Sequence, residues 1–151
     1  MKNRALTLFG HIETMMDNFI DIQQQQGGEI DCLSKPEFRL LKVLIDSGDC
    51  TMSELATKAR FVLSTSTVTV DKLVSKKLVQ RQRPEADRRT VVVKITAEGR
   101  DAYKKQLDRL IELSTGMLES LSEEEQILFL QFFAKIGNYF ASKNALMASK
   151  N

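Results

Sequence analysis

The 151-residue sequence has no tryptophan, one histidine, two cysteines and two prolines, and these scarcities exclude several classes of protein. The single histidine, His11, has no carboxylate pair of evident purpose and no glycine-rich phosphate loop to work with, so we expect no enzyme. Cys32 and Cys50 lie far apart and lack the spacing of metal ligands, so neither a metal nor another cofactor is expected. Two ordinary thiols are the favoured interpretation, and a redox role for either stays open.

Long hydrophobic runs are also missing from the sequence. No stretch of about 18 apolar residues exists, which argues against a membrane span. The start Met1-Lys2-Asn3-Arg4 and the polar residues that follow it do not resemble a secretory signal. We therefore expect a cytoplasmic protein, long enough for one full domain or for a small domain plus an assembly element.

The positive charge is concentrated in one part of the chain. The formal net charge is only +2, but residues 60–94 hold nine lysines and arginines against three acids, and the remainder of the chain is net acidic. A basic centre within an acidic frame is typical of a local contact with nucleic acid. The alternative is a solvated charged surface without a partner.

The segment from Thr51 to Thr96 is predicted to hold two short helices and a β-hairpin. The second helix should begin near Ser64, which can cap it, and run to about Lys77. On a 3.6-residue period it has one apolar side and a neighbouring side of hydroxyls and lysines. Such side chains suit phosphates and base edges. The residues expected to form the DNA-contacting helix are Ser64, Thr65, Ser66, Val68, Thr69, Lys72 and Lys76.

Two strands are predicted at Leu78–Arg83 and Thr90–Ile95, with residues 84–89 as the hairpin tip. Asp87, two residues before Arg89, can hold that guanidinium in an extended pose suited to a narrow minor groove. A local salt bridge without a DNA role is the alternative. The residues expected on this wing are Arg83, Asp87, Arg88 and Arg89, and the helix and hairpin together predict a winged helix-turn-helix.

The terminal segments carry more apolar surface than a single buried side requires. A long helix is expected from about Asn3 to Gln25, and two more follow Thr96, the last of them with two adjacent apolar stripes. We interpret these segments as a dimerisation layer, against the alternative of a monomer with a larger helical core. The residues chosen to represent this layer are Leu8, Ile12, Phe19, Leu130, Phe133, Ile136 and Phe140.

The expected fold is therefore mainly α with a small antiparallel β-wing (α+β), a winged helix-turn-helix with a helical dimerisation layer from both termini. The expected boundaries are 1–32 for the first dimerisation helix, 33–96 for the DNA-binding lobe and 97–151 for the last helices. Capping boxes at Ser34–Glu37, Thr51–Glu54 and Ser122–Glu125 mark three helix starts. Thr96 is expected to cap a fourth.

Several short motifs stand out along the chain, namely Ser53-Glu54-Leu55-Ala56, Asp71-Lys72-Leu73, Leu78-Val79-Gln80-Arg81, Asp87-Arg88-Arg89 and Ile95-Thr96-Ala97-Glu98-Gly99. With these motifs the chain resembles the MarR (multiple antibiotic resistance regulator) family of bacterial transcription factors. The resemblance covers nearly the whole chain and is strongest from Leu33 to Arg100. Its most specific part is the Asp-Arg-Arg motif of the wing, followed at this distance by Thr-x-x-Gly.

The resemblance implies a homodimer that binds a pseudo-palindromic site in double-stranded DNA and typically represses transcription. It also implies a small, often aromatic or anionic, effector that releases the DNA. Thr65, Thr69 and Lys72 match DNA-facing positions of the family, and Asp87 and Arg89 match its wing.

Two positions depart from the family pattern. Lys77 stands where relatives usually have glycine, so the helix is expected to end differently. Val68 replaces a polar group, and a valine can touch a thymine methyl but cannot donate to guanine. The rival hypothesis keeps the winged helix but uses it as a protein–protein interaction module without sequence-specific DNA binding.

Overall fold

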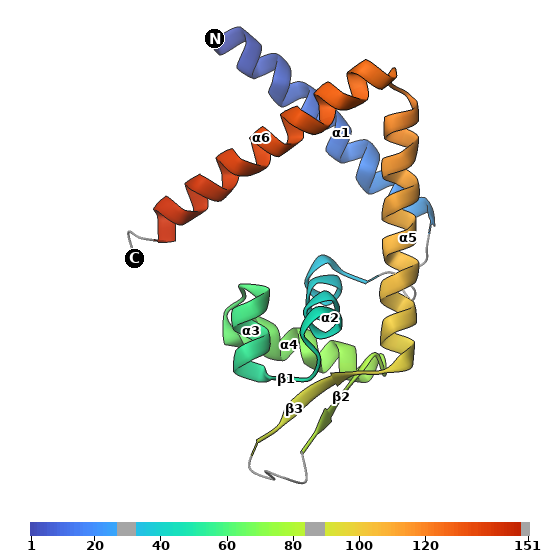
Figure 1. Cartoon of the computed structure of the whole chain (residues 1–151), viewed down its shortest axis with the longest axis vertical. Helices are drawn as coiled ribbons and strands as arrows, with labels where there is room; N and C mark the ends of the chain where they lie inside the picture. The colour runs from blue at the N-terminus through green and yellow to red at the C-terminus, as the bar shows by residue number, and fades with distance from the viewer. Residues whose placement is uncertain (27–32, 84–89, 149–151) are drawn as a thin grey trace. The chain divides into compact units, whose positions relative to one another are not determined.

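The computed structural model describes residues 1–26, 33–83 and 90–148 of the chain. It consists of two compact units, Met1–Gln106 and Leu107–Asn151. The elements in chain order, drawn in Figure 1, are α1 (Lys2–Gln26), α2 (Lys35–Ser47), β1 (Cys50–Thr51), α3 (Met52–Ala59), α4 (Leu63–Ser75), β2 (Val79–Gln82), β3 (Val92–Ile95), α5 (Ala97–Glu119) and α6 (Glu123–Ala148). None of the described helices has the length and apolarity that crossing a membrane requires. The mainly helical fold with a small β-wing is confirmed.

The helix starts follow the local sequence signals. Ser34 and Glu37 form a reciprocal capping box at α2, in which the Glu37 carboxylate accepts from the Ser34 backbone N–H at 2.8 Å. The same arrangement joins Thr51 and Glu54 at α3. Ser122 and Glu125 repeat it before α6. The three predicted capping boxes are therefore confirmed.

The two ends of α4 differ from the prediction. The helix begins at Leu63 after Val62, which makes no side-chain cap bond, so the assignment of Ser64 as the cap is wrong. At the other end the backbone N–H groups of Lys77 and Leu78 donate to the carbonyls of Val74 and Leu73, both at 2.9 Å. This is a Schellman motif, and it holds Lys77 at a left-handed φ of 60°.

The lysine at position 77 thus adopts the conformation that glycine would take more easily, and the expectation that the helix ends differently is wrong. Arg60, the C-cap of α3, is also left-handed, with φ 56° and ψ 43°. The C-terminal ends of α3 and α4, the two corners of the helix-turn-helix, therefore each use a basic residue in a backbone conformation that costs about 1–2 kcal/mol for a residue with a Cβ.

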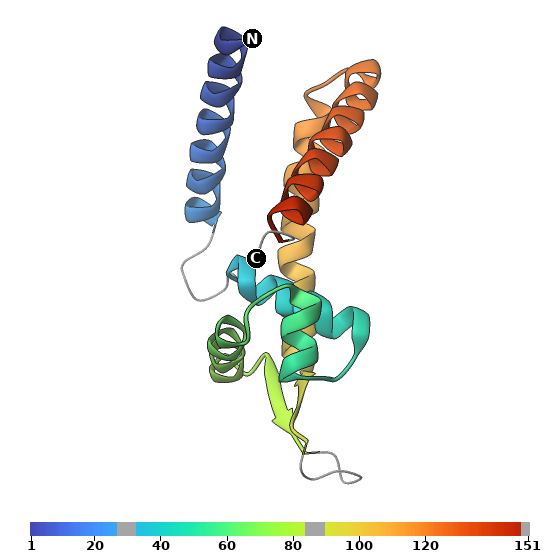
Figure 2. The same cartoon turned by 90° about the vertical axis from the view of Figure 1, so that its left-hand side faces the viewer.

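The sheet has the order β1-β3-β2 with antiparallel pairing throughout. Its hairpin pairs Val79 with Ile95 and Gln82 with Val92, and in Figure 2 it extends away from the helices of the lobe. The two strands are shorter than predicted, and the predicted tip, residues 84–89, lies outside the described residues. The sequence did not reveal β1, because it is only two residues long.

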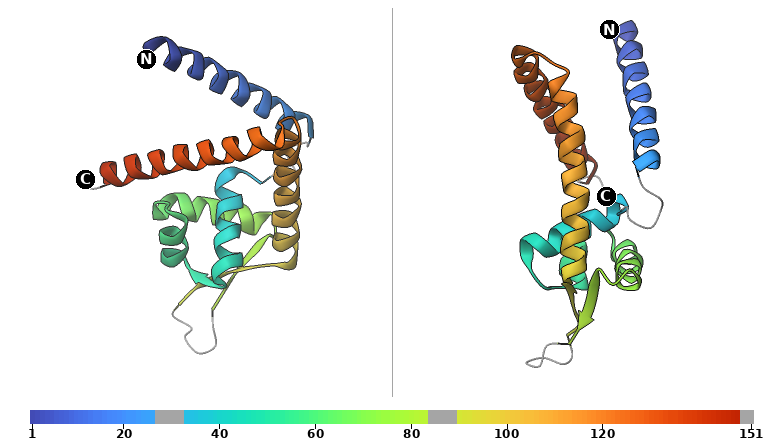
Figure 3. Two further views of the ribbon diagram at one scale, coloured as in Figure 1. Left: turned by 45° about the horizontal axis from the view of Figure 1, so that its top comes forward. Right: turned by 90° about the vertical axis from the view of Figure 1, so that its right-hand side faces the viewer.

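The core of the lobe lies between α2, α3, α4 and the sheet, whose arrangement is visible from two further sides in Figure 3. The largest fully buried side chains are Leu40, Leu41, Leu44, Leu55, Leu73, Val70, Val93, Cys50 and Ser66. The first turns of α5 join this core through Tyr103, whose ring stacks on Phe38 of α2 at 4.6 Å between centroids.

Thr96 ties the end of α4 to the start of α5. Its hydroxyl lies 2.9 Å from the carbonyl oxygens of both Lys77 and Leu78, and it accepts a hydrogen bond from the Gly99 N–H at 3.0 Å. The predicted cap is therefore confirmed. A Cβ on Gly99 would clash with the Leu78 carbonyl and lie 2.9 Å from a side-chain carbon of Ile95. This close approach explains the glycine in the closing motif.

We therefore expect two glycine-to-alanine substitutions in the same helix to act in opposite directions. Gly99→Ala should lower the free energy of unfolding by about 1–3 kcal/mol, because the backbone of Leu78 must move. Gly116→Ala should raise it by up to about 1 kcal/mol, because its Cβ would meet nothing within 4 Å and alanine favours a helix. Chemical denaturation of the purified variants measures both. Equal effects of the same sign would contradict this account of the joint.

Candidate nucleic-acid interface

The helix α4 buries one side against the rest of the lobe. Ser66, Val70 and Leu73 are fully buried. At roughly 100° per residue, the side opposite to them carries Ser64, Val68, Asp71 and Ser75, all of them exposed. We call these four residues the outer face. Thr65 and Lys72 are also exposed and flank this face on one side.

Two residues expected to contact DNA are buried instead. Ser66 is fully buried, so its hydroxyl cannot reach a ligand outside the lobe. Thr69 is 6% exposed and donates its hydroxyl to the Thr65 carbonyl at 2.7 Å. Both assignments are corrected here, because the neighbours of α4 cover a wider arc than its apolar residues alone indicate. Ser64, Thr65, Val68 and Lys72 remain available at the surface.

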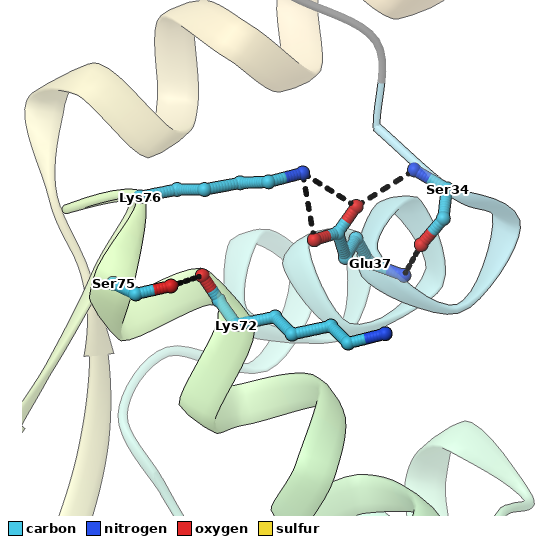
Figure 4. A network of polar contacts seen from close by, with 5 residues as sticks. All are labelled: Ser34, Glu37, Lys72, Ser75 and Lys76. Atoms are coloured by element: carbon cyan, nitrogen blue, oxygen red, sulfur yellow. Dashed lines mark hydrogen bonds and ion pairs between the residues drawn. The ribbon is translucent and has the colours of Figure 1, made fainter. Parts of the chain in front are cut away.

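Lys76 is bound to α2 rather than presented outward. Its ammonium group lies 2.9 Å and 3.1 Å from the two carboxylate oxygens of Glu37, which is only 2% exposed. Figure 4 shows this carboxylate between the ammonium group and the backbone N–H of Ser34. Lys76 was expected on the DNA-contacting side; its side chain is still 37% exposed, but its ammonium group joins the end of α4 to the start of α2, and a role toward DNA stays a prediction.

The surroundings of Glu37 decide its charge. Burial acts to raise the pKa of this carboxyl, but the hydrogen bonds from Lys76 and from Ser34 outweigh it, so the pKa of Glu37 lies below its ordinary value. The carboxylate is therefore charged at neutral pH, and the ion pair persists there. Because both partners are polar and one is buried, this contact fixes position more than it adds stability.

A second ion pair joins α4 to the wing. Asp71 on the outer face accepts from the guanidinium of Arg81 on β2 at 2.6 Å. The side chains are 55% and 37% exposed, so the pair contributes little to stability, but it occupies the one acid on α4. The sequence did not reveal this contact, because no local signal reports how α4 is rotated relative to β2.

The wing residues are only partly covered by the structure. Arg83, just beyond β2, is exposed as predicted. Asp87, Arg88 and Arg89 lie outside the described residues, so their predicted roles stay predictions. Nearer the lobe, the ammonium group of Lys94 on β3 lies 4.0 Å from the Asp49 carboxylate.

The described residues contain no cluster of three or more histidine, cysteine or acidic side chains that could hold a metal ion. Cys50 is a free and buried thiol, and Cys32 lies outside the described residues. The residues predicted for dimerisation are all exposed, namely Leu8, Ile12 and Phe19 on α1 and Leu130, Phe133, Ile136 and Phe140 on α6.

Comparison with known proteins places this geometry among transcription regulators. The model of the MarR family matches residues 33–91. The chain is 30% identical over 139 residues to an uncharacterised HTH-type transcriptional regulator, YsmB of Bacillus subtilis. The matched residues cover 90% of this chain and 95% of YsmB.

Two solved structures share the fold. Streptococcus pneumoniae FabT, solved in complex with DNA, matches 89% of this chain and 96% of its own with a TM-score of 0.73 and 20% identity. Bordetella bronchiseptica BpsR, described in a study of how 6-hydroxynicotinic acid regulates its DNA binding, matches 86% and 98% with a TM-score of 0.60 and 21% identity.

The Glu37–Lys76 contact gives stability a dependence on pH. Glu37→Gln keeps the shape and removes the charge, so it should lower the free energy of unfolding at pH 7 by roughly 1–3 kcal/mol. Because the folded pKa is depressed, this contribution is full above the ordinary glutamate pKa of about 4.3 and is lost as the pH falls through the folded value.

The difference between parent and Glu37→Gln should therefore shrink as the pH falls below about 5 in denaturation titrations. Glu54→Gln measures the pH dependence of a capping box alone, because the bonds from Thr51 lower the pKa of Glu54 as well, at an exposed site for which the structure gives no ion pair. Parallel stability curves for parent and Glu37→Gln over this range would show that the ion pair is not formed.

Proposed function

This chain belongs to the MarR family and is a DNA-binding transcriptional regulator, and from this premise we propose that it acts as a homodimer on pseudo-palindromic duplex DNA. Residues 33–96 serve as the DNA-binding lobe, and residues 1–32 and 97–151 supply the dimerisation helices. The rival interpretation as a protein–protein module is not favoured, because the chain matches an HTH-type transcriptional regulator along most of its length.

The main support for a dimer is the exposed apolar surface of α6. From residue 123 to residue 147 every side chain of this helix is exposed, except those of Gln126 and Phe129, which are half-buried. The large apolar side chains that it exposes are Ile127, Leu128, Leu130, Phe132, Phe133, Ile136, Tyr139, Phe140, Leu146 and Met147. A helix that is apolar on more than one side needs a partner on more than one side.

The N-terminal helix makes the same demand. Leu8, Ile12 and Phe19 recur on α1 at helical spacing and are 57%, 42% and 39% exposed. A second copy of the chain carries the same excess of apolar surface and is present wherever the first copy is. It is therefore the partner that we propose for these helices. Closed twofold symmetry buries such self-complementary faces. We therefore assign both terminal segments to the dimer.

A twofold dimer carries two copies of α4 and two wings. Two such helices enter successive major grooves when they lie about 34 Å apart, one helical turn of the duplex. Ser64, Thr65 and Lys72 supply hydroxyls and a cation to phosphates and base edges. Arg89 enters the flanking minor groove, oriented by Asp87, as the wing sequence predicts.

Repression and release by an effector complete the proposal. A dimer seated on a promoter excludes other proteins from it, and a small aromatic or anionic molecule that changes the spacing of the two α4 helices weakens binding. Support comes from BpsR, a protein of the same fold whose DNA binding is regulated by 6-hydroxynicotinic acid. We place the protein in the cytoplasm, where duplex DNA is accessible in bacteria.

The dimer is tested by charge placed on α6. Ile136→Glu puts a carboxylate on an exposed apolar position and should shift the mass measured by light scattering toward that of one 17.1 kDa chain at micromolar concentration. Gln131→Glu adds the same charge at an exposed polar position of the same helix and should leave the dimer intact. A parent protein of single-chain mass would refute the dimer outright.

The DNA interface is tested by the salt dependence of binding. Arg89→Ala and Lys72→Ala should each weaken binding and lower the salt slope by about 1 per subunit, because each removes one cation from the interface with the polyanionic duplex. Lys105→Ala, an exposed lysine on α5, is the control and should leave the slope unchanged. Binding of Arg89→Ala as tight as that of the parent at every salt concentration would remove the wing from the interface.

A further inference from the structure

The centre of the outer face of α4 is apolar. Val68 lies between Ser64 and Asp71 on this face, and it is 56% exposed although valine is normally a core residue. It makes no contribution to the buried core, whose residues from α4 are Val70 and Leu73. Its side chain is therefore open to a partner that covers the outer face.

Two charged residues of α4, Asp71 and Lys72, lie near Val68. Lys72 is the only lysine or arginine in α4, all of whose residues the structure describes, and it flanks the outer face rather than belonging to it. Figure 4 shows its side chain extending from the helix to the same side as that of Lys76. Asp71 is paired with Arg81 at 2.6 Å, so its carboxylate does not present an unpaired negative charge beside Val68. Among the four residues of the outer face, Val68 is the one apolar side chain.

The chemistry of the major groove leaves one target for such a group. Valine neither donates nor accepts a hydrogen bond, so it cannot read the edges of guanine, cytosine or adenine. The C5-methyl group of thymine is the one apolar feature in the groove. Removing a methyl group from water is worth about 0.8 kcal/mol, which corresponds to about a fourfold change in affinity.

We propose that Val68 is a specificity-determining residue that reads the C5-methyl group of a thymine in each half-site of the operator. This inference rests on the proposed function, in which the outer face of α4 lies in the major groove. It adds that the operator has a T·A pair at one fixed position in each half, placed symmetrically about its centre. Loss of both methyl groups should weaken binding by about 15-fold in the dimer.

The experiment starts from the sites that the full-length parent protein selects from a random pool of duplexes. Each selected thymine is then replaced by deoxyuridine, symmetrically in both half-sites, which removes only the methyl group. Binding of every duplex is measured for the parent and for Val68→Ala. This variant removes the two γ-methyl groups from an exposed helical position where alanine is at least as favourable as valine, so the fold is preserved.

The two changes form a thermodynamic cycle. The parent should lose about 15-fold at one symmetric pair of thymines, whereas Val68→Ala should lose several-fold less, because only its Cβ remains to meet the thymine methyl group. Val74→Ala is the matched control, because Val74 lies on the same helix at the margin of the buried side, and it should keep the full sensitivity to deoxyuridine.

A deoxyuridine penalty that persists unchanged in Val68→Ala would overturn the inference, because the methyl group would then act through another residue or through the shape of the duplex. No penalty at any selected thymine would overturn it as well. If the parent selects no site at all, the proposed function fails first. The two failures are therefore distinguishable.

Discussion

One buried carboxylate sets the position of α4, the helix that we propose faces DNA. Glu37 accepts from the backbone N–H of Ser34 at the start of α2 and binds the ammonium group of Lys76 at the end of α4. A buried charge that loses its partner is costly, so these two helix ends cannot separate without a penalty. The contact acts at the C-terminal end of α4, while Val70 and Leu73 hold its middle against the core.

The rotation of α4 about its axis follows from these contacts, and it decides which side chains meet a ligand. With Lys76 turned toward α2 and Thr69 buried, the outer face consists of Ser64, Val68, Asp71 and Ser75. Arg81 then neutralises the acid on that face from the neighbouring strand. The result is a surface with hydroxyl and methyl groups at its centre and cations at its margins. Such a surface suits bases in the middle and phosphates at the edges.

Local signals in the sequence predicted what is decided locally. The capping boxes at Ser34, Thr51 and Ser122 involve residues three apart and were all found, as was the cap at Thr96. The wing strands were found because their alternation and hairpin length are local as well, although the predicted strands were one or two residues too long at three of their four ends. The resemblance to a known family singled out further motifs, which the periodicity of apolar residues does not distinguish from the rest of the chain.

Contacts between distant residues could not be predicted in the same way. Glu37 and Lys76 are 39 residues apart, and no pattern in either segment indicates that they meet. The same holds for Asp71 and Arg81, and for the coverage that buries Ser66 and Thr69. The helical period gives the angle between two side chains of α4. Which of them face the rest of the lobe depends on how the whole helix is rotated about its axis, and packing decides that rotation.

The left-handed corners at Arg60 and Lys77 have a consequence for how this lobe tolerates change. A glycine would relax the backbone at either corner, yet each corner holds an exposed basic residue. The molecule therefore keeps two cations beside its helix-turn-helix at the expense of conformational ease. Selection for heat resistance alone would favour glycine at both corners, and the positive field around the lobe would weaken with each replacement.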